Sequence, residues 1–523
     1  MFSSFRNRFN NIRGGSSHRT HEENNVQEVH KNPDRNAYGR PSFLNQTHAE
    51  LGACLDFTTR PIVVPKSETS LPWKAGYAEC TSANKKKNED QTAVGEVKLD
   101  HQLTRQQQDD LKSITEAHAS VASIRGMYFG VFDGHGGHGA SLIVADQLIN
   151  HIQEKLVEVQ KEIFELALIE KKERAERKKL LAQEDPSSSE EVERNASSNS
   201  PSKSKRSECK LSPSGITFDD LIVGALEASF RDMDEHIERE KASFNITGGC
   251  CALVALFICG KVYVANAGDC RAVAYLGNIP VPLSVDFKAD RDMERIYHTA
   301  YCRPDLLGGV FTMDRYVRMA KLGPMHVGEK VWCKPPMYTG WTSKYMTKDD
   351  IKLPLIVGKG RTSRLMHTIG ICRSLGDHDL CFETDHDRVP IKPFLSSFPE
   401  VRILDLRDRS VSDADVMVIG SDGLWDVMSN KQAAEILSSP TEGEGDEVIT
   451  HSRYGKLARR LVSHVKGTEM PDNRGWKLAS GKEASYDDIS CLVIPLHQVA
   501  ESTKLTFSYG HVFSPSSGSD SSS

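Results

Sequence analysis

Short apolar runs that end in an aspartate beside a glycine or a second acid recur in this 523-residue chain, and they constrain its fold more than any other feature. A short apolar run bounded by an Asp–Gly turn indicates a buried strand that ends there. Three runs end in this way: 127–132 before DGHGG (133–137), 262–267 before GDCR (268–271) and 416–420 before SDGLWD (421–426). In a fourth place the acids come first, because Asp487-Asp488 stands directly before the run 489–496.

The spacing of these runs also predicts the fold class. Residues 248–275 form apolar runs separated by tight turns at 259–261 and near Gly268, and short turns imply antiparallel pairing. Helical periodicity runs from Ala140 to about Leu181, and Thr217 opens a second long helix with acids in its first turn. Antiparallel strands with inserted helices indicate an α+β fold.

The acids at the strand ends predict a cation site. At 133–135 a carboxylate, a glycine carbonyl and an imidazole follow one strand, and oxygen donors suit Mg²⁺ or Mn²⁺. Glu89 and Asp90 stand at the mouth of another strand-like segment. A single aspartate at a strand end is usually a turn former or helix cap. Several such ends together favour a shared cation site, and a histidine beside it suits general acid chemistry.

The ordered motifs resemble a known family. NED (88–90), DGHGG, GDCR, RSLGD (373–377), DGLWD and DDIS are similar to those of the metal-dependent serine/threonine protein phosphatases, the PPM or type 2C family. LPWKAGYAE (71–79), YVANAGD (263–269), IKPFLSSFPEVRI (391–403) and GDHDL (376–380) resemble its H/J/M subfamily. The resemblance implies two packed, mainly antiparallel β-sheets flanked by helices, with the metals at one end. It also implies hydrolysis of phosphoserine and phosphothreonine by a metal-bridging hydroxide.

The resemblance further implies the site residues. Two Mg²⁺ or Mn²⁺ ions would be held by Glu89, Asp90, Asp133, Gly134, Asp422 and Asp487, with Asp269 and Asp422 holding a weaker third ion. Asp133 would bridge both ions, while Glu89 and Asp90 would act through metal-bound waters, which suits the hydration of Mg²⁺. His135 would protonate the leaving seryl or threonyl oxygen.

Two positions depart from the family pattern. The arginine that usually grips the phosphate is replaced by Lys85, which offers a point charge instead of a planar fork. Either Lys85 or a neighbour binds phosphate more weakly, or a flap compensates. A DHKP-like pattern is replaced by DFKA at 286–289, which we expect to touch no metal ligand.

The excess length lies in tails and insertions around one phosphatase domain, residues 70–498. We expect residues 16–50, the Ser-, Glu- and Lys-rich insertion at about 183–215 and the tail 499–523 to be disordered. A further insertion at about 321–361 carries aromatic and basic residues and would be either a flap beside the catalytic cleft or a stabilising surface piece.

Residues 1–15 place Phe2, Phe5, Phe9 and Ile12 on one helical arc flanked by arginines. This pattern predicts either an amphipathic helix that binds membranes peripherally or a disordered tail. No long apolar span is visible, and twelve cysteines without a C-x-x-C pair favour a cytoplasmic protein. Cys54 and Arg60 match the C-x₅-R spacing of cysteine-dependent phosphatases, but the loop lacks glycine, so we treat the match as coincidence.

Three functions remain to be weighed. The acids of the site are all present, which favours a phosphatase over a catalytically weak scaffold that binds phosphoproteins. A metal-dependent nuclease would need a basic groove to bind nucleic acid, and the net charge of −6 does not favour such binding. The partners are therefore phosphorylated proteins, and the H/J/M resemblance suggests small GTPases of the Rab class among them.

Overall fold

The computed structural model describes residues 40–54, 56, 58–67, 69–82, 88–109, 120–181, 215–317, 323–335, 338–384, 388–439, 453–470, 475–499, 503 and 505–508. Lys85, the segment 1–15, all of the insertion 183–215 except Gly215, and the tail beyond residue 508 lie outside these ranges. Within the described ranges, no helix combines the length and the apolar character needed to cross a membrane.

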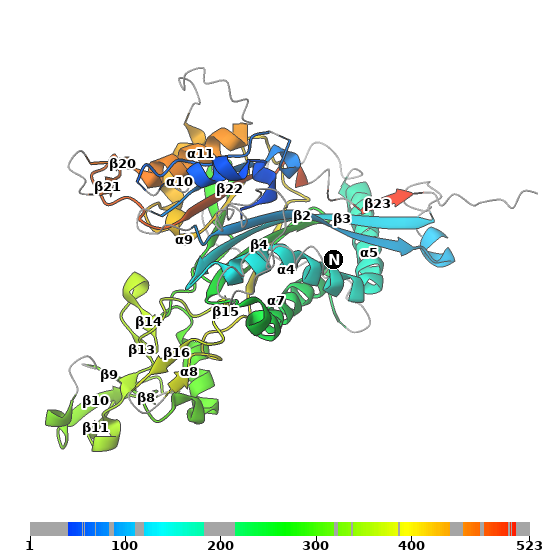
Figure 1. The fold of residues 1–523 in the computed structure, drawn as a ribbon. Coiled ribbons are helices and arrows are strands. Elements are labelled where there is room, and N and C mark those ends of the chain that lie inside the picture. The colour runs from blue at the N-terminus through cyan, green and yellow to red at the C-terminus, as the bar shows by residue number, and fades with distance from the viewer. Residues whose placement is uncertain are drawn as a thin grey trace, which may run out of the picture.

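Two antiparallel sheets form the centre of the molecule (Figure 1). The first has five strands in the order β1 (Gly76–Cys80), β22 (Ile489–Pro495), β19 (Val416–Gly420), β6 (Arg271–Leu276) and β7 (Ile279–Pro282). The second has the order β18 (Glu400–Asp405), β5 (Lys261–Ala267), β4 (Gly249–Ile258), β3 (Val121–His135) and β2 (Gln91–Gln102), with β15 (Leu375–Gly376) on β4 and β23 (Leu505–Ser508) on β3.

The central strands are apolar on both faces because both faces are covered. Along β4, Leu253 packs into the core between the two sheets, whereas Val254 packs under the helices on the other side. On β19, Met417 faces the core between the sheets and Val418 faces the opposite helical layer. Such strands appear in sequence as continuous apolar runs, as the sequence shows.

Helices form the two outer layers (Figure 1). The larger sheet is covered by α4 (Gly139–Glu158), α5 (Gln160–Leu181) and α7 (Phe218–Phe244), and the smaller sheet by α9 (Asp422–Trp425), α10 (Asn430–Ser438) and α11 (Arg453–Lys466). The Thr217 hydroxyl accepts a hydrogen bond from the Asp220 N–H, which confirms the predicted start of α7. The α+β sandwich is therefore confirmed.

The path after β5 differs from a simple series of hairpins. The β4–β5 hairpin is confirmed, with Ile258 opposite Lys261. The turn near Gly268, however, carries the chain into the other sheet, where β6 pairs with β19 and not with β5. Tight turns predict antiparallel neighbours only when both strands stay in one sheet.

Two of the segments expected to be disordered are partly ordered. Residues 40–50 begin an N-terminal arm, residues 40–64, which includes η2 (Ser42–Leu44) and α2 (His48–Ala53) and buries Leu44 and Leu51 in the core between the sheets. In the tail, β23 pairs with β3. Both expectations were wrong at these residues because contacts with the distant sandwich order otherwise polar segments.

A lobe, residues 293–365 with the β16–β17 hairpin, projects from the sandwich (Figure 1). It contains α8 (Met293–Cys302), η5 (Pro304–Leu307), β8 (Phe311–Thr312), η7 (Pro324–His326), η8 (Lys348–Asp350), β12 (Leu353–Pro354), η9 (Gly360–Thr362), β16 (Cys381–Glu383) and β17 (Arg388–Pro390). Its distal sheet is β9 (Arg315–Tyr316), β10 (Lys330–Lys334) and β11 (Thr342–Tyr345), and a nearer pair is β13 (Ile356–Val357) with β14 (Arg364–Leu365). A last small hairpin, β20 (Thr468–Glu469) with β21 (Trp476–Lys477), lies beyond α11.

Candidate metal centre and active site

Strand register brings the acids of the larger sheet to one end of the sandwich. Asp133, near the end of β3, pairs with Cys251 on β4, and β5 ends opposite Ala252, so Asp269 follows close by. Gln91 pairs with Phe132, which sets Glu89 and Asp90 beside the same strand end. In antiparallel sheets the end of one strand lies next to the start of its neighbour, so these acids converge.

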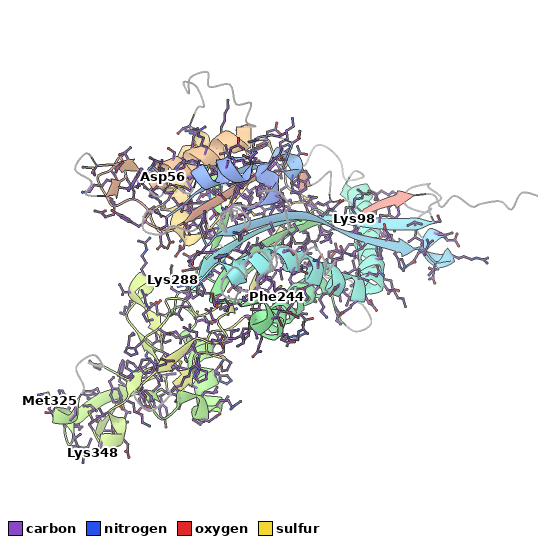
Figure 2. The ribbon with its side chains drawn as sticks, in the orientation of Figure 1. Asp56, Lys98, Phe244, Lys288, Met325 and Lys348 are labelled. Carbon is purple, nitrogen blue, oxygen red and sulfur yellow. The ribbon has the colours of Figure 1, made fainter. Side chains whose placement is uncertain are left out.

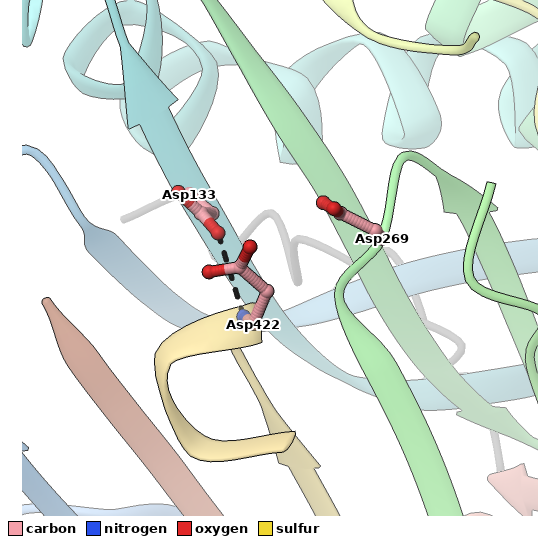
Figure 3. Close-up of side chains that lie close together, drawn as sticks. All are labelled: Asp133, Asp269 and Asp422. Atoms are coloured by element: carbon pink, nitrogen blue, oxygen red, sulfur yellow. Dashed lines mark hydrogen bonds between the residues drawn. The ribbon is translucent and has the colours of Figure 1, made fainter. Parts of the chain in front are cut away.

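The smaller sheet delivers its acids to the same place. Gly420, the last residue of β19, pairs with Cys491 near the start of β22. Asp422 and Asp487 therefore lie at neighbouring strand ends. The Asp422 N–H points to Oδ2 of Asp133 at 3.4 Å, across the gap between the two sheets (Figure 3).

Three carboxylates gather at the centre of this end (Figure 3). One carboxylate oxygen from each of Asp133, Asp269 and Asp422 lies within 4.8 Å of the other two. Burial raises the pKa of Asp133 well above its usual value, and the neighbouring acids Asp422, Asp90, Asp269 and Asp487 raise it further. Burial and then Asp269 likewise raise the pKa of Asp422. Crowded oxygen donors with unfavourable mutual repulsion are a suitable ligand set for a hard divalent cation.

The other predicted acids surround this group. Asp90 is buried, and burial followed by the charge of Asp488 raises its pKa to about 7. Asp487 is exposed at the rim and contributes to the field at Asp133 and Asp422. Glu89 is half-buried, and its carbonyl accepts a hydrogen bond from Ser141 Oγ at 2.6 Å.

Backbone contacts fix these acids in place. The Asp488 carboxylate accepts hydrogen bonds from the Ser82 N–H at 2.6 Å and the Glu89 N–H at 2.9 Å, so it fastens both ends of the segment that contains Lys85. Gly134 allows the close approach of strand ends, because a side chain there would begin 2.5 Å from the Glu89 carbonyl oxygen. Lys85 itself lies outside the described residues.

His135 has a partner for which the sequence had suggested no role. Its Nε2 lies 2.9 Å from Oδ2 of Asp377, which also accepts a 2.6 Å hydrogen bond from Ser374 Oγ. Burial lowers the pKa of His135, but the Asp377 carboxylate more than offsets this and raises it above its usual value. Gly249 leaves room for that carboxylate, since a side chain would begin 2.1 Å from Oδ2. The Gly–Asp pair at 376–377, within the RSLGD motif, was the available signal.

Lys288 lies in the acidic group, contrary to the expectation that the DFKA segment touches no metal ligand. Its Nζ is 2.5 Å from Oδ2 of Asp269 and 3.6 Å from both Asp422 and Asp426. Burial lowers the pKa of Lys288, but the three carboxylates raise it above its usual value, so its ammonium is charged. In Figure 2, Lys288 lies where the lobe meets the sandwich. Residue spacing alone could not show this contact.

A cavity of about 680 Å³ opens beside the acids. Its lining includes Asp422, Asp426 and Asp487. The lobe also contributes, because Arg361 reaches Asp426 with Nη2 at 3.2 Å from Oδ1. This end of the sandwich therefore offers oxygen ligands, a charged lysine and arginine, and a histidine whose pKa is raised, with an open cleft beside Asp422 and Asp487, which suits hydrolysis of an anionic ester.

Comparison with known proteins agrees with this chemistry. Residues 149–296 and 353–467 match the family described as protein phosphatase 2C. Protein phosphatase 1H of Homo sapiens is 34% identical over 489 residues, covering 89% of this chain and 92% of the relative. Protein phosphatase 1J of Homo sapiens is 35% identical over 475 residues, covering 88% and 86%. The solved serine-threonine phosphatase 2C from Toxoplasma gondii is 17% identical and aligns over 83% of this chain and 99% of its own, with a TM-score of 0.39.

The site and these similarities define a metal-dependent hydrolase of phosphoproteins. The chain belongs to the protein phosphatase 2C family, which confirms the resemblance drawn from its motifs. It is a metal-dependent serine/threonine protein phosphatase, and its similarity to phosphatases 1H and 1J confirms the H and J part of the subfamily resemblance.

Proposed function

We propose that Asp133 is the central ligand of a two-ion centre of Mg²⁺ or Mn²⁺. The observation that carries this proposal is the convergence of Asp133, Asp269 and Asp422 within 4.8 Å. Asp422 and Asp487 would complete the ligand set of one ion. The Gly134 carbonyl would bind the other ion, and Glu89 and Asp90 would contact it through bound water. When bound, such ions activate water and neutralise charge on phosphoryl oxygens.

The chain's own side chains supply the remaining chemistry. His135, whose pKa the Asp377 carboxylate raises, donates a proton to the departing seryl or threonyl oxygen. Lys288 supplies a fixed positive charge at Asp269, which would weaken the third ion that Asp269 and Asp422 hold. Arg361 and Lys85 are the candidates for gripping the phosphate, since the first lines the cavity and the second occupies the family's arginine position.

The role of His135 predicts a pH effect that depends on the leaving group. Asp377→Asn removes the charge that raises the pKa of His135, so the protonated acid is lost at a lower pH. The alkaline limb of kcat for a phosphoserine peptide should move to lower pH, and turnover just above neutrality should fall about tenfold. The measurement is the pH dependence of kcat.

Two controls separate this effect from damage to the site. p-Nitrophenolate leaves without a proton, so the profile with p-nitrophenyl phosphate should change little. In a His135→Gln background, Asp377→Asn should have no further effect on the profile. If the pH dependence of kcat for the phosphoserine peptide is the same in Asp377→Asn as in the wild type, His135 is excluded as the proton donor.

We further propose that the lobe binds the protein substrate. In the β10–β11 hairpin, Cys333 and Lys344 face inward, where Lys344 contacts Asp314 at 2.7 Å and Asp350 at 2.8 Å. The opposite face carries Trp332 and Tyr345, which are 57% and 70% exposed. Exposed aromatic side chains are enriched at protein-binding surfaces.

The substrates we propose are phosphorylated small GTPases of the Rab class, which the resemblance of the motifs to the H/J/M subfamily suggests. Met325 and Lys348 lie at the distal end of the lobe, far along it from Lys288 at its junction with the sandwich (Figure 2), so a folded substrate in the cleft would lie beside the lobe. We also propose a cytoplasmic location with peripheral membrane contact through residues 1–15.

Changing both exposed aromatics should affect large substrates alone. Trp332→Ser with Tyr345→Ser should lower kcat/KM for a phosphorylated Rab-type GTPase about tenfold and leave p-nitrophenyl phosphate hydrolysis unchanged, because only a large substrate uses remote binding energy. Ile279→Ser is a matched control, since Ile279 is 67% exposed on β7, outside the lobe. Equal losses on both substrates would indicate a stabilising insertion.

A further inference from the structure

The N-terminal arm runs along the edge of the smaller sheet and contacts the backbone of segments that carry acids of the proposed metal centre. Val63 and Glu79 exchange two backbone hydrogen bonds of 2.9 Å, so the arm lies along β1. It is the dark blue segment in Figure 1, and Figure 2 marks it at Asp56. Two buried arginines of this arm, Arg40 and Arg60, contact segments that carry the acids of the site.

Arg60 holds the loop before β22. Its side chain is fully buried, and the guanidinium donates to the carbonyls of Thr81 at 2.9 Å, Ser485 at 2.7 Å and Asp487 at 3.4 Å. The guanidinium carbon also lies 5.4 Å from the ring centroid of Trp476. One planar fork thus joins the arm, the segment after β1 and the loop that presents the Asp487 carboxylate.

The backbone of Arg60 adds a second observation. Its φ of +48° is left-handed, a conformation that is unfavourable for a residue with a long side chain. Its N–H is held by the Asp56 carbonyl at 2.8 Å. Among the described residues, no carboxylate makes a hydrogen bond to the buried Arg60 guanidinium. A strained residue with such a buried charge must be held by its surroundings, and such residues cluster at functional sites.

Arg40 makes the corresponding contact on the other side. Its Nη1 donates to the Asp90 carbonyl at 2.7 Å, and its guanidinium forms a buried ion pair with Glu79. Glu79 is itself fixed by the Tyr77 hydroxyl at 2.6 Å. Arg40 therefore ties the strand β1 to the residue whose side chain lies among the proposed ligands.

We propose that Arg60 and Arg40 are positioning residues of the phosphatase, which set the geometry of the metal centre through the backbones of Asp487 and Asp90. The inference rests on the proposed ligand roles of those two aspartates. The contacts with Asp90 and Asp487 described above go to backbone carbonyls, so each arginine acts by limiting where the backbone of its aspartate can lie. Metal affinity is sensitive to such outer contacts, because a misplaced ligand weakens binding even when its chemistry is unchanged.

The test is Mn²⁺ binding to full-length Arg60→Lys, measured by calorimetry after removal of bound metal. Lysine keeps the charge but cannot bond three carbonyls in one plane. We expect about tenfold weaker Mn²⁺ binding, at the lower end of the range for outer partners of metal ligands. The Mn²⁺ concentration for half-maximal activity should rise equally, while kcat at saturating Mn²⁺ returns close to that of the wild type, since all ligands remain.

Leu226→Ala is the control for stability alone. Leu226 is fully buried between α7 and the larger sheet, away from the acids, so its truncation should lower the melting temperature without changing Mn²⁺ affinity. Wild-type Mn²⁺ affinity in Arg60→Lys, with a lowered melting temperature, would make Arg60 a structural residue only and overturn the proposal.

Two further variants keep the outcome decisive. If Arg60→Lys does not fold, Arg40→Lys is measured in its place, with the same expected loss of affinity and the same contradicting result. Asp133→Ala separates the two levels of inference. Unchanged Mn²⁺ binding in Asp133→Ala would exclude the proposed ligand set itself. Weakened Mn²⁺ binding in Asp133→Ala, together with normal binding in the arginine variants, would exclude only the positioning role of the two arginines.

Discussion

Asp133→Ala is expected to lower phosphoserine hydrolysis by roughly three orders of magnitude, because the variant loses the carboxylate that faces both Asp269 and Asp422. The fold should survive. In the presence of EDTA the variant should melt no lower than the wild type, since a buried and mutually repelled carboxylate has been removed. Turnover of a phosphoserine peptide and melting temperature on one preparation check both parts.

The sign of the stability effect follows from the pKa shifts. In the metal-free chain, folding raises the pKa of these acids, to about 7 for Asp90. Their contribution to stability is therefore present below the ordinary aspartate pKa of 3.8 and is lost as the pH rises through the raised values. Metal-free wild type should be less stable at pH 7 than in mild acid, and Asp133→Ala should show a weaker dependence.

A buried aspartate at the opposite end of β19 is the matched control. Asp415 accepts hydrogen bonds from the Gly277 N–H at 2.6 Å and the Ser412 N–H at 2.7 Å. Asp415→Ala should cost about 1–3 kcal/mol of stability and leave turnover intact below its melting temperature. Near-normal turnover in Asp133→Ala would contradict its central place, and uniformly low turnover in the wild type would favour the scaffold alternative.

Asp269→Ala is expected to uncouple substrate binding from turnover. Asp133, Asp422 and Asp487 remain to hold the two proposed ions that bind the phosphoprotein, but turnover should fall by roughly two orders of magnitude because the proposed third cation would lose its ligand. Phosphorylated partners should then stay bound and co-purify with the variant. The measurement is the amount of phosphoprotein retained, together with turnover and melting temperature.

Lys288 provides the opposing variant. Since its ammonium lies 2.5 Å from Asp269, Lys288→Met should free that carboxylate and strengthen binding of a weak additional Mn²⁺ ion. If Asp269 only supports the turn before Arg271, Asp269→Ala would be destabilised and retain nothing. A well-folded Asp269→Ala enzyme with near-normal turnover would exclude a third ion from the mechanism.

Much of the centre could be predicted from the sequence because its acids stand at strand ends. Antiparallel register then brings Asp133, Asp269 and Asp422 together without any knowledge of loops. The start of α7 could also be predicted, because Thr217 and Asp220, which cap it, are only three residues apart in the sequence. Features set by neighbouring residues and by strand periodicity are visible in sequence.

Other features depend on contacts between distant residues. The β6 strand leaves its hairpin partner for β19, and the turn at Gly268 does not reveal which sheet the chain will join. The Arg60–Ser485 contact joins residues 425 positions apart, and the His135–Asp377 contact joins residues 242 apart. Polarity suggested that residues 40–50 were disordered, whereas burial of Leu44 and Arg40 orders them. No local pattern encodes these partners.

The central claim is that phosphatase activity depends on divalent ions held by the acids at the end of the sandwich. The most direct measurement is phosphate release from a phosphoserine protein by the full-length wild type, first in EDTA and then across a Mn²⁺ titration. We expect no turnover in EDTA and full recovery as Mn²⁺ is added, with no recovery in Asp133→Ala at any concentration. Full wild-type turnover in the chelator would contradict the claim.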